Sequence, residues 1–363
     1  MYNIGLPSGK SLFQYQAERI LSLQRVASAT HGGVSGVSIP WYVMTSGPTR
    51  VATENFFKEN NYFGIDPANV MFFNQGVLPG FTPEGKFFME NKFTPFTAPD
   101  GNGGIYAALR KEGVIADLER RGIPYIHAYC VDNCLVKVGD PTFIGYCVSK
   151  KADCGAKSVP KISWDEQVGV ICQNNGKFAV VEYSEIGDDL AQAKDAAGGL
   201  LYNAANIANH FYTVEFLKKT EAMEDELEYH IAHKKIKHVD LETGEQVVPT
   251  SSNGIKLELF IFDVFPFTQR MSVLEVPRAS EFSPLKNKTG SSSAETSRND
   301  ILSLHAKFAK EAGALVKGDS ALEISPLVSY EGEGLEGLKG VTIETPVEIS
   351  FDDAGKELKL SKK

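Results

Sequence analysis

Short apolar runs alternate with amphipathic segments over the first part of this chain. Runs that end in small or polar residues, as buried strands of a parallel sheet do, occupy residues 39–46, 69–76 and 124–133. Helices are expected over residues 10–30, 49–60 and 103–122. This order predicts an α/β fold with a doubly wound, mostly parallel sheet. Ligands bind beyond the carboxyl ends of such strands, where Gln75 and Asp132 lie.

The pattern changes after about residue 150. Two apolar runs flank Asn174-Asn175-Gly176, which predicts a β-hairpin over residues 168–185. A long helix is expected over residues 191–219 and a strand over residues 257–267. The last fifty residues indicate short strands. We therefore expect a central domain over residues 1–300 and a small β-rich domain over residues 301–363.

Charge and composition exclude several classes of protein. The formal net charge is -9, which argues against binding nucleic acid through bulk positive charge. No run approaches the roughly 20 apolar residues of a membrane span. The five cysteines show neither C-x-x-C spacing nor an even count, so reduced thiols in a cytoplasmic protein are expected.

Two loops at predicted strand ends could contact a ligand. Asp132 follows an apolar strand, where a lone carboxylate could hold a divalent cation or, equally, initiate a turn. Residues 99–104, Pro-Asp-Gly-Asn-Gly-Gly, open a helix. Three glycines there could let the backbone approach a ligand closely, and Asn102 adds an amide. A flexible connecting loop is the alternative.

Further candidates lie in the second half. Glu182 could accept hydrogen bonds from two sugar hydroxyls, although an exposed strand glutamate is the simpler interpretation. Asn203, Asn206 and Asn209 recur every three residues and would share one face of the expected helix, with His210 beside them as a structural residue. Lys286 could neutralise a phosphate, and the alternative is a solvated surface lysine.

Nine motifs in a fixed order resemble one family, the eukaryotic UDP-N-acetylglucosamine pyrophosphorylases, or UDP-N-acetylhexosamine uridylyltransferases. They are MYNIGLP (residues 1–7), SLFQYQAERI (11–20), WYVMTSGPT (41–49), FFNQG (72–76), PDGNGG (99–104), YCVDN (129–133), VVEYSEI (180–186), NAANIANHF (203–211) and EFSPLKN (281–287). The resemblance implies a Rossmann-like nucleotidyltransferase fold. It also implies that UTP and N-acetylglucosamine 1-phosphate react to give UDP-N-acetylglucosamine and pyrophosphate, with Mg²⁺ as cofactor and without a covalent enzyme intermediate.

The resemblance also implies roles for single residues. The expected uracil contacts are Gln75 and Gly101. The expected contacts to the N-acetyl sugar are Asn102, Gly169, Glu182 and Asn206. Asp132 is expected to bind Mg²⁺, and Lys286 is the expected catalytic residue, which would meet the phosphates.

The chain departs from the family pattern in two places. Ala205 stands where the family usually has glycine. The family also carries a glycine-rich phosphate loop and a Pro-Lys-Gly segment upstream of its Met-Tyr pair, and Met1 coincides with that methionine, so the chain as written is expected to be inactive. One alternative is a non-catalytic protein that binds sugar nucleotides or other partners. Another is a UDP-glucose pyrophosphorylase, although those enzymes generally carry Gly-His-Gly-Asp at residues 101–104.

Overall fold

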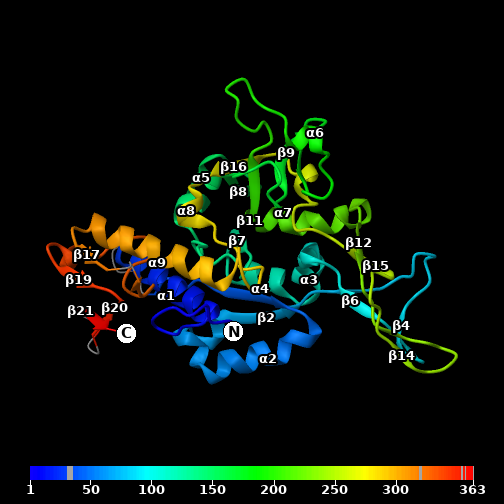
Figure 1. Cartoon of the computed structure of the whole chain (residues 1–363), viewed down its shortest axis with the longest axis horizontal. Helices are drawn as coiled ribbons and strands as arrows, with labels where there is room; N and C mark the ends of the chain where they lie inside the picture. Colours follow the sequence, from blue (N-terminus) through cyan, green and yellow to red (C-terminus); the bar gives the residue numbers. More distant parts are fainter. Residues whose placement is uncertain (31–35, 319–320, 353–354, 356, 363) are drawn as a thin grey trace.

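The first strands pair as the sequence predicts. The computed structural model describes residues 1–30, 36–318, 321–352, 355 and 357–362. Strand β1 (Trp41–Thr45) runs parallel to β2 (Val70–Asn74). Helices α1 (Leu12–Thr30) and α2 (Gly47–Glu59) pack against this pair (Figure 1). The packing centres on Phe57, which is fully buried and contacts the rings of Phe13 and Trp41.

The central sheet is mixed, so the expectation of a mostly parallel sheet is wrong. Its strand order is β10-β9-β11-β8-β16, and β7 pairs with the other part of β11. The strands are β7 (Tyr125–Tyr129), β8 (Cys154–Pro160), β9 (Val170–Asn174), β10 (Lys177–Val181), β11 (Ala204–Thr213) and β16 (Met271–Glu275). Within this sheet, β16 and β8 are parallel, whereas β11 runs antiparallel to β7, β8 and β9. The predicted hairpin of β9 and β10 is confirmed.

The expected helix over residues 191–219 is wrong. The segment forms β11, preceded by the single turn α6 (Asp188–Ala191) and followed by α7 (Val214–Lys219). Alternate residues of β11, Ala205 and Ile207, are buried, as a two-residue repeat requires. Alanine and asparagine fit either a helix or a strand locally, and pairing with β7 and β8 decides for the strand.

Two other predicted elements are shorter than expected. The helix over residues 103–122 is two helices, α3 (Ile105–Lys111) and α4 (Val114–Arg120), because Gly113 adopts a positive φ of 79° between them. The strand expected over residues 257–267 is only β15 (Gly254–Glu258), after which the chain turns and forms a 3₁₀ turn over Phe265–Phe267. The bend directly after β15 brings residues 259–261 against the glycine-rich loop at residues 99–104.

A long β-arm projects from the domain at the right of Figure 1. Its strands are β3 (Val77–Pro79), β4 (Met89–Asn91), β5 (Thr94–Pro95), β6 (Thr97–Pro99), β12 (His230–Lys234), β13 (His238–Val239), β14 (Gln246–Val247) and β15. The pairs β3·β6, β4·β5, β12·β15 and β13·β14 are all antiparallel. Two short helices, α5 (Pro141–Ser149) and α8 (Arg278–Glu281), lie beside the central sheet.

The predicted short strands near the end of the chain are confirmed. They are β17 (Leu315–Lys317), β18 (Leu322–Ile324), β19 (Thr342–Glu344), β20 (Val347–Phe351) and β21 (Leu358–Lys362). Helix α9 (Ala294–Glu311) runs across the expected boundary at residue 300. Its Ile301 packs with Ile4 and Leu12, whereas its Ala309 packs with the strands that follow. The division into two domains therefore stays a prediction.

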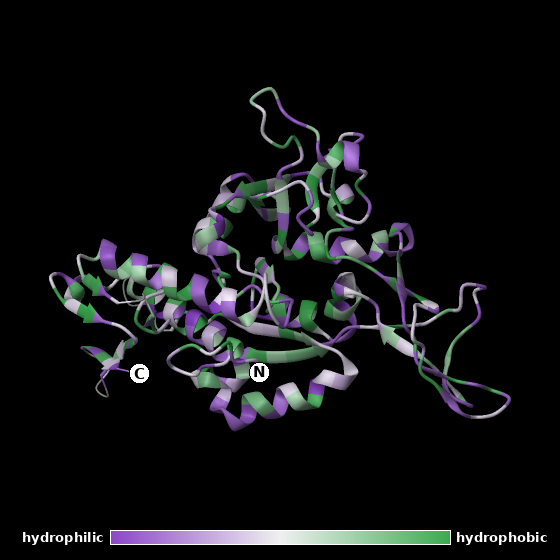
Figure 2. Cartoon of the chain, in the orientation of Figure 1, coloured by the Kyte–Doolittle hydropathy of each residue, from purple (hydrophilic) through white to green (hydrophobic). Residues whose placement is uncertain are grey.

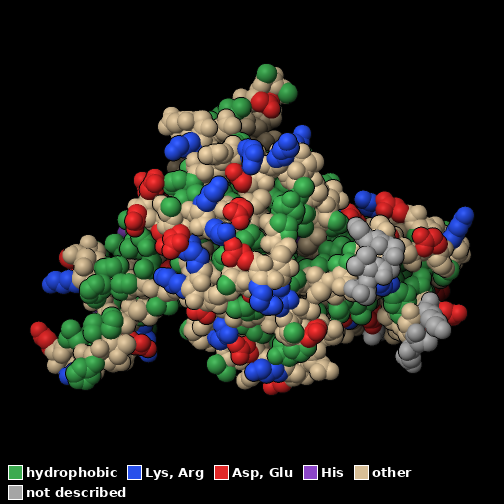
Figure 3. All heavy atoms as spheres, turned by 180° about the vertical axis from the view of Figure 1, so that it is seen from behind, with side chains coloured by type: hydrophobic (Ala, Val, Ile, Leu, Met, Phe, Trp, Pro, Cys, Tyr) green, Lys and Arg blue, Asp and Glu red, His purple; other side chains and the backbone are tan. Residues whose placement is uncertain are grey.

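The surface mixes both signs of charge. In Figure 2, α2, which covers β1 and β2, alternates hydrophobic and hydrophilic residues. On the face seen in Figure 3, basic and acidic side chains are interspersed. In the part of the chain that the structure describes, no helix is both long and apolar enough to cross a membrane.

Candidate active site

Gln75 and Gly101, the two predicted uracil contacts, lie together. Gln75 follows β2, and its backbone N–H donates to the carbonyl of Thr45 at 2.9 Å. Its side-chain Nε2 donates to the carbonyl of Gly101 at 3.0 Å and to Oδ1 of Asp100 at 3.3 Å. The sheet therefore holds this amide at the carboxyl ends of β1 and β2, where the sequence places a ligand.

The glycines after Asp100 pack against the chain itself, which corrects the expectation that they make room for a ligand. Gly101 has φ 90° and ψ 173°, and an added Cβ would lie 2.3 Å from the carbonyl oxygen of Leu259. The N–H of Gly103 donates to that oxygen at 2.8 Å. Asn102 is exposed, and its Oδ1 accepts from the N–H of Ile261 at 2.8 Å. Because this bond uses only the oxygen of the Asn102 amide, the Nδ2 group could donate to a ligand.

Asn206 lies on β11 beside Gly169. Its backbone N–H donates to the carbonyl of Gly169 at 2.8 Å. Its side-chain oxygen accepts from the N–H of Ala208 at 3.1 Å, and because a backbone N–H can only donate, this contact fixes which atom of the amide is the oxygen. Ala208 has φ 50° inside a β-bulge between Asn206 and His210. Asn209 contacts His127 instead, so the asparagines do not form one stripe.

His210 contacts the side-chain oxygen of Asn206 and helps to fix the orientation of its amide. Its Nε2 lies 3.1 Å from Oδ1 of Asn206, and its Nδ1 lies 3.1 Å from the hydroxyl of Tyr212. The ring is fully buried, and burial lowers its pKa to about 3, so it is neutral. Since Asn206 Oδ1 is an acceptor, Nε2 carries the proton and Nδ1 accepts from Tyr212. The Nδ2 group of Asn206 is left as the donor.

Glu182 follows β10 and packs closely on Gly169. An added Cβ on Gly169 would lie 2.7 Å from Oε1 of Glu182, so the glycine makes room for this carboxylate. Burial and the nearby Glu185 raise the pKa of Glu182, while Lys286 and His230 oppose the rise. His230 was missed in the sequence, and it lies 3.0 Å from both Glu185 and Asp263.

Asp132 and Lys286 lie on two segments that are hydrogen-bonded to each other. The N–H of Leu285 donates to the carbonyl of Asp132 at 2.9 Å. Burial raises the pKa of the Asp132 carboxyl, and the positive charge of Lys286 opposes that rise. No ion pair within 4.0 Å involves either side chain in the described part of the chain, so the lysine is close enough to influence the carboxylate without neutralising it.

The residues present fit Mg²⁺. Asp132 supplies a half-buried carboxylate with no direct ion pair among the described residues, which is the hard oxygen ligand that Mg²⁺ prefers. No group of three or more His, Cys, Asp or Glu residues gathers into a metal cage within the described ranges. Mg²⁺ commonly binds through one or two carboxylates together with substrate phosphates, so this ligand set suits an ion that arrives with the nucleotide.

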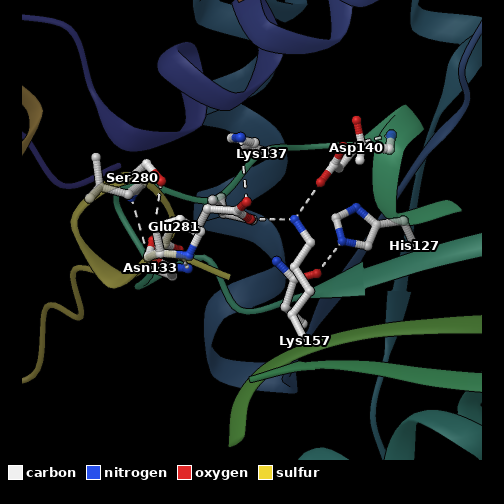
Figure 4. A network of polar contacts seen from close by, with 12 residues as sticks. His127, Asn133, Lys137, Asp140, Lys157, Ser280 and Glu281 are labelled. Atoms are coloured by element: carbon white, nitrogen blue, oxygen red, sulfur yellow. Dashed lines mark hydrogen bonds and ion pairs between the residues drawn. The ribbon is translucent and has the colours of Figure 1, made fainter. Parts of the chain in front are cut away.

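A buried charge network behind these segments was also missed. Figure 4 shows the ammonium of Lys157 between the carboxylates of Asp140 and Glu281, with Lys137 on the other side of Glu281. The Lys157 side chain is 0 % exposed. A lone lysine inside the otherwise uncharged strand β8 is the sequence signal that could have revealed it.

The site is open. Lys286 and Asn102 are exposed, and the carboxylates behind them are partly buried. Two hollows of about 370 and 460 Å³ lie elsewhere, the first beside α9 and the second beside α4 and α7, and neither is lined by a predicted site residue. The predicted residues therefore lie beside strands of two sheets: Gln75 and Gly101 beside the β1·β2 pair, and the others at or near strands of the central sheet or beside its β7 end.

Comparison with known proteins assigns the chain to a family. The model of the family described as UTP–glucose-1-phosphate uridylyltransferase matches residues 3–331. The human protein called UDP-N-acetylhexosamine pyrophosphorylase-like protein 1 is 47% identical over 376 residues, which span 98% of this chain and 74% of that protein. The UDP-N-acetylglucosamine pyrophosphorylase of Saccharomyces cerevisiae is 47% identical over 345 residues, or 93% of this chain and 71% of that protein.

Solved structures agree. A crystal structure from Entamoeba histolytica described as a UDP-N-acetylglucosamine pyrophosphorylase superposes with a TM-score of 0.88 at 38% identity, covering 96% of this chain and 87% of that one. A UDP-glucose phosphorylase from Trypanosoma brucei superposes with a TM-score of 0.59 at 16% identity, covering 89% and 66%. The second likeness shows the fold alone.

Proposed function

Because the chain belongs to the UTP–glucose-1-phosphate uridylyltransferase family, we propose that its reaction is that of the family's N-acetylhexosamine branch. The inactivity expected of the chain as written stays a prediction, which the turnover assay below tests. The chain is a nucleotidyltransferase of the UDP-N-acetylglucosamine pyrophosphorylase type. The substrates are UTP and N-acetylglucosamine 1-phosphate, and the products are UDP-N-acetylglucosamine and pyrophosphate. A cytoplasmic location stays a prediction.

The chemistry is a phosphoryl-group transfer in which the protein positions the reactants. A phosphate oxygen of the sugar phosphate forms a bond to the α-phosphorus of UTP, and the bond from that phosphorus to the bridging oxygen breaks as pyrophosphate leaves. Bound Mg²⁺ would neutralise phosphate charge, with Asp132 as its protein ligand. Lys286 would add a positive charge at the phosphates. Both groups lower the energy of a transition state in which charge spreads over phosphate oxygens.

The sugar contacts come from three further elements. Glu182 would accept hydrogen bonds from sugar hydroxyls, and Asn206 would donate through the Nδ2 group that His210 leaves available. Gln75 and the backbone at Gly101 would contact the uracil, while Asn102 would contact the sugar. Hydrogen bonds inside the protein hold the amides of Gln75, Asn102 and Asn206, and Glu182 packs on Gly169, which reduces the entropy lost when the substrates bind.

The observation that carries the proposal is the hydrogen bond from the N–H of Leu285 to the carbonyl of Asp132 at 2.9 Å, which joins the segment of Lys286 to that of Asp132. The charge of Lys286 also opposes the rise that burial causes in the pKa of Asp132 and of Glu182, which supports a common site. Identity of 38 to 47% to proteins named for the N-acetyl sugar supports the N-acetylhexosamine branch.

The test combines binding with turnover. Calorimetric titration of the chain with UDP-N-acetylglucosamine and with UDP-glucose should show tighter binding of the N-acetyl sugar. Glu182→Gln should weaken it by about tenfold, since one charged hydrogen bond contributes about 1.5–3 kcal/mol. Glu311→Gln, an exposed glutamate on α9, is the matched control and should not change it.

Turnover is followed by release of pyrophosphate from UTP and N-acetylglucosamine 1-phosphate. Binding without turnover would favour a sugar-nucleotide-binding protein over an enzyme. Preference for UDP-glucose would favour the other branch. A chain that bound neither sugar nucleotide would refute the proposal.

A further inference from the structure

Two segments that carry residues expected to contact the phosphates meet at the end of the central sheet. We call this contact between them the crossing. One segment follows β7 and contains Asp132, and the other follows α8 and contains Lys286. The N–H of Cys134 donates to the carbonyl of Ser283, and the N–H of Leu285 donates to the carbonyl of Asp132, both at 2.9 Å. The two segments thus form a single antiparallel β-bridge, in which Asn133 lies opposite Pro284.

The Asn133 side chain makes three hydrogen bonds to backbone groups of these two segments. Its Oδ1 accepts from the N–H of Ser283 at 3.0 Å and from the N–H of Leu135 at 3.3 Å. Its Nδ2 donates to the carbonyl of Glu281 at 2.8 Å. The residue is 2 % exposed. An amide so fully occupied inside the protein contacts no substrate, and its effect is to fix one segment on the other.

Ion pairs fix the Glu281 end of this crossing to the central sheet. Glu281 directs its side chain to Lys157 and Lys137, and Lys157 also pairs with Asp140 (Figure 4). The carbonyl that Asn133 binds therefore belongs to a residue whose side chain is itself fixed to β8. Asn133 connects the Asp132 segment to a rigid part of the sheet rather than to a free loop.

We infer that Asn133 is a positioning residue of the transfer reaction, which sets the separation between the Asp132 carboxylate and the Lys286 ammonium. The inference rests on the proposed function, because it assumes that both groups meet the same phosphates. A metal ligand and a phosphate-binding cation must be placed to a fraction of an ångström to act together. The two backbone bonds alone join the segments at single points. The Asn133 side chain adds two bonds between the segments, to Ser283 and Glu281, and a third to Leu135 that fixes the side chain on its own segment.

The decisive variant is Asn133→Ala. Mn²⁺ serves as the probe of the Mg²⁺ site, and its binding is titrated by electron paramagnetic resonance in the presence of UDP-N-acetylglucosamine. The dissociation constant for Mn²⁺ should rise by about tenfold or more, as it does when outer partners of metal ligands are removed. Affinity for UDP-N-acetylglucosamine without metal should stay within about twofold, since Glu182 and Asn206 lie on other elements. The kcat for pyrophosphate release should fall by at least about tenfold.

Asn253→Ala is the matched control. Its amide likewise makes two hydrogen bonds to backbone, to the N–H of Ile236 at 2.7 Å and to its carbonyl at 3.0 Å, but it lies in the β-arm. The control should lose stability without any change in Mn²⁺ affinity. Equal Mn²⁺ affinity in the two alanine variants would overturn the inference.

A second variant decides the matter if Asn133→Ala does not fold. Asn133→Asp keeps the two bonds accepted by Oδ1 and loses the bond donated to Glu281. Its Mn²⁺ dissociation constant should rise by a smaller factor, about threefold. Unchanged or tighter Mn²⁺ binding would overturn the inference. A wild-type chain that bound neither Mn²⁺ nor UDP-N-acetylglucosamine would refute the proposed function, and this inference with it.

Discussion

Replacing Lys157 by methionine should destabilise the protein strongly. Lys157 is 0 % exposed, and the side chains of Asp140 and Glu281 that it pairs with are 3 % and 6 % exposed. Methionine fills most of the same volume but leaves both carboxylates buried without their main counter-charge. Breaking a buried ion pair in this way costs about 3–5 kcal/mol, because the remaining charge is far from water.

The pKa of Asp140 determines how the stability lost in Lys157→Met depends on pH. Burial alone would raise the pKa of Asp140, but Lys157 lowers it below its ordinary value. The stabilisation from Asp140 is therefore present above its unfolded pKa of about 3.9, and it is lost as the pH falls through the folded value. Without Lys157 the carboxyl group of Asp140 takes up a proton more readily, since burial then raises its pKa with less opposition. The deficit of Lys157→Met should thus be largest near pH 7 and smaller near pH 5.

Urea unfolding followed by tryptophan fluorescence measures the free energy, since Trp41 lies in the core. The triple variant Lys157→Met, Asp140→Asn, Glu281→Gln should regain most of the loss, because it removes all three charges and Asn can still cap α5 as Asp140 does. Lys307→Met is the control, as its side chain is exposed and pairs weakly with Glu311. A loss for Lys157→Met of less than about 1 kcal/mol, or one independent of pH, would refute the reasoning.

Three further predictions concern the site. Gly101→Ala should cost about 3 kcal/mol or more in urea unfolding, since it combines a positive φ with a steric clash, whereas Gly85→Ala, at a positive φ with open space, should cost about 1 kcal/mol. Affinity for UDP-N-acetylglucosamine, measured by calorimetry, should fall as the pH drops through the raised pKa of Glu182, and Glu182→Gln should abolish that dependence. His210→Phe should weaken the same binding by about tenfold, because only the N–H of Ala208 then holds the Asn206 amide, and unchanged binding would exclude this role.

Local sequence signals sufficed where one segment determines its own structure. The apolar runs around Trp41 and Val70 became β1 and β2, and Asn174-Asn175-Gly176 became the predicted hairpin. Residue types at strand ends likewise pointed to Gln75 and Asp132 as candidates. These inferences depend on side-chain periodicity and turn chemistry, which act over a few neighbouring residues.

Long-range pairing decided the rest. Strand β11 was predicted as a helix because alanine and asparagine have no strong local preference, and only the neighbouring strands β7 and β8 made it a strand. The partners of Lys157 are Asp140 and Glu281, which are 17 and 124 positions away. The sequence alone thus determined which elements alternate and which residue types end them, whereas the direction of the central strand and the charge network behind the site arise from contacts between distant segments, which local preferences cannot encode.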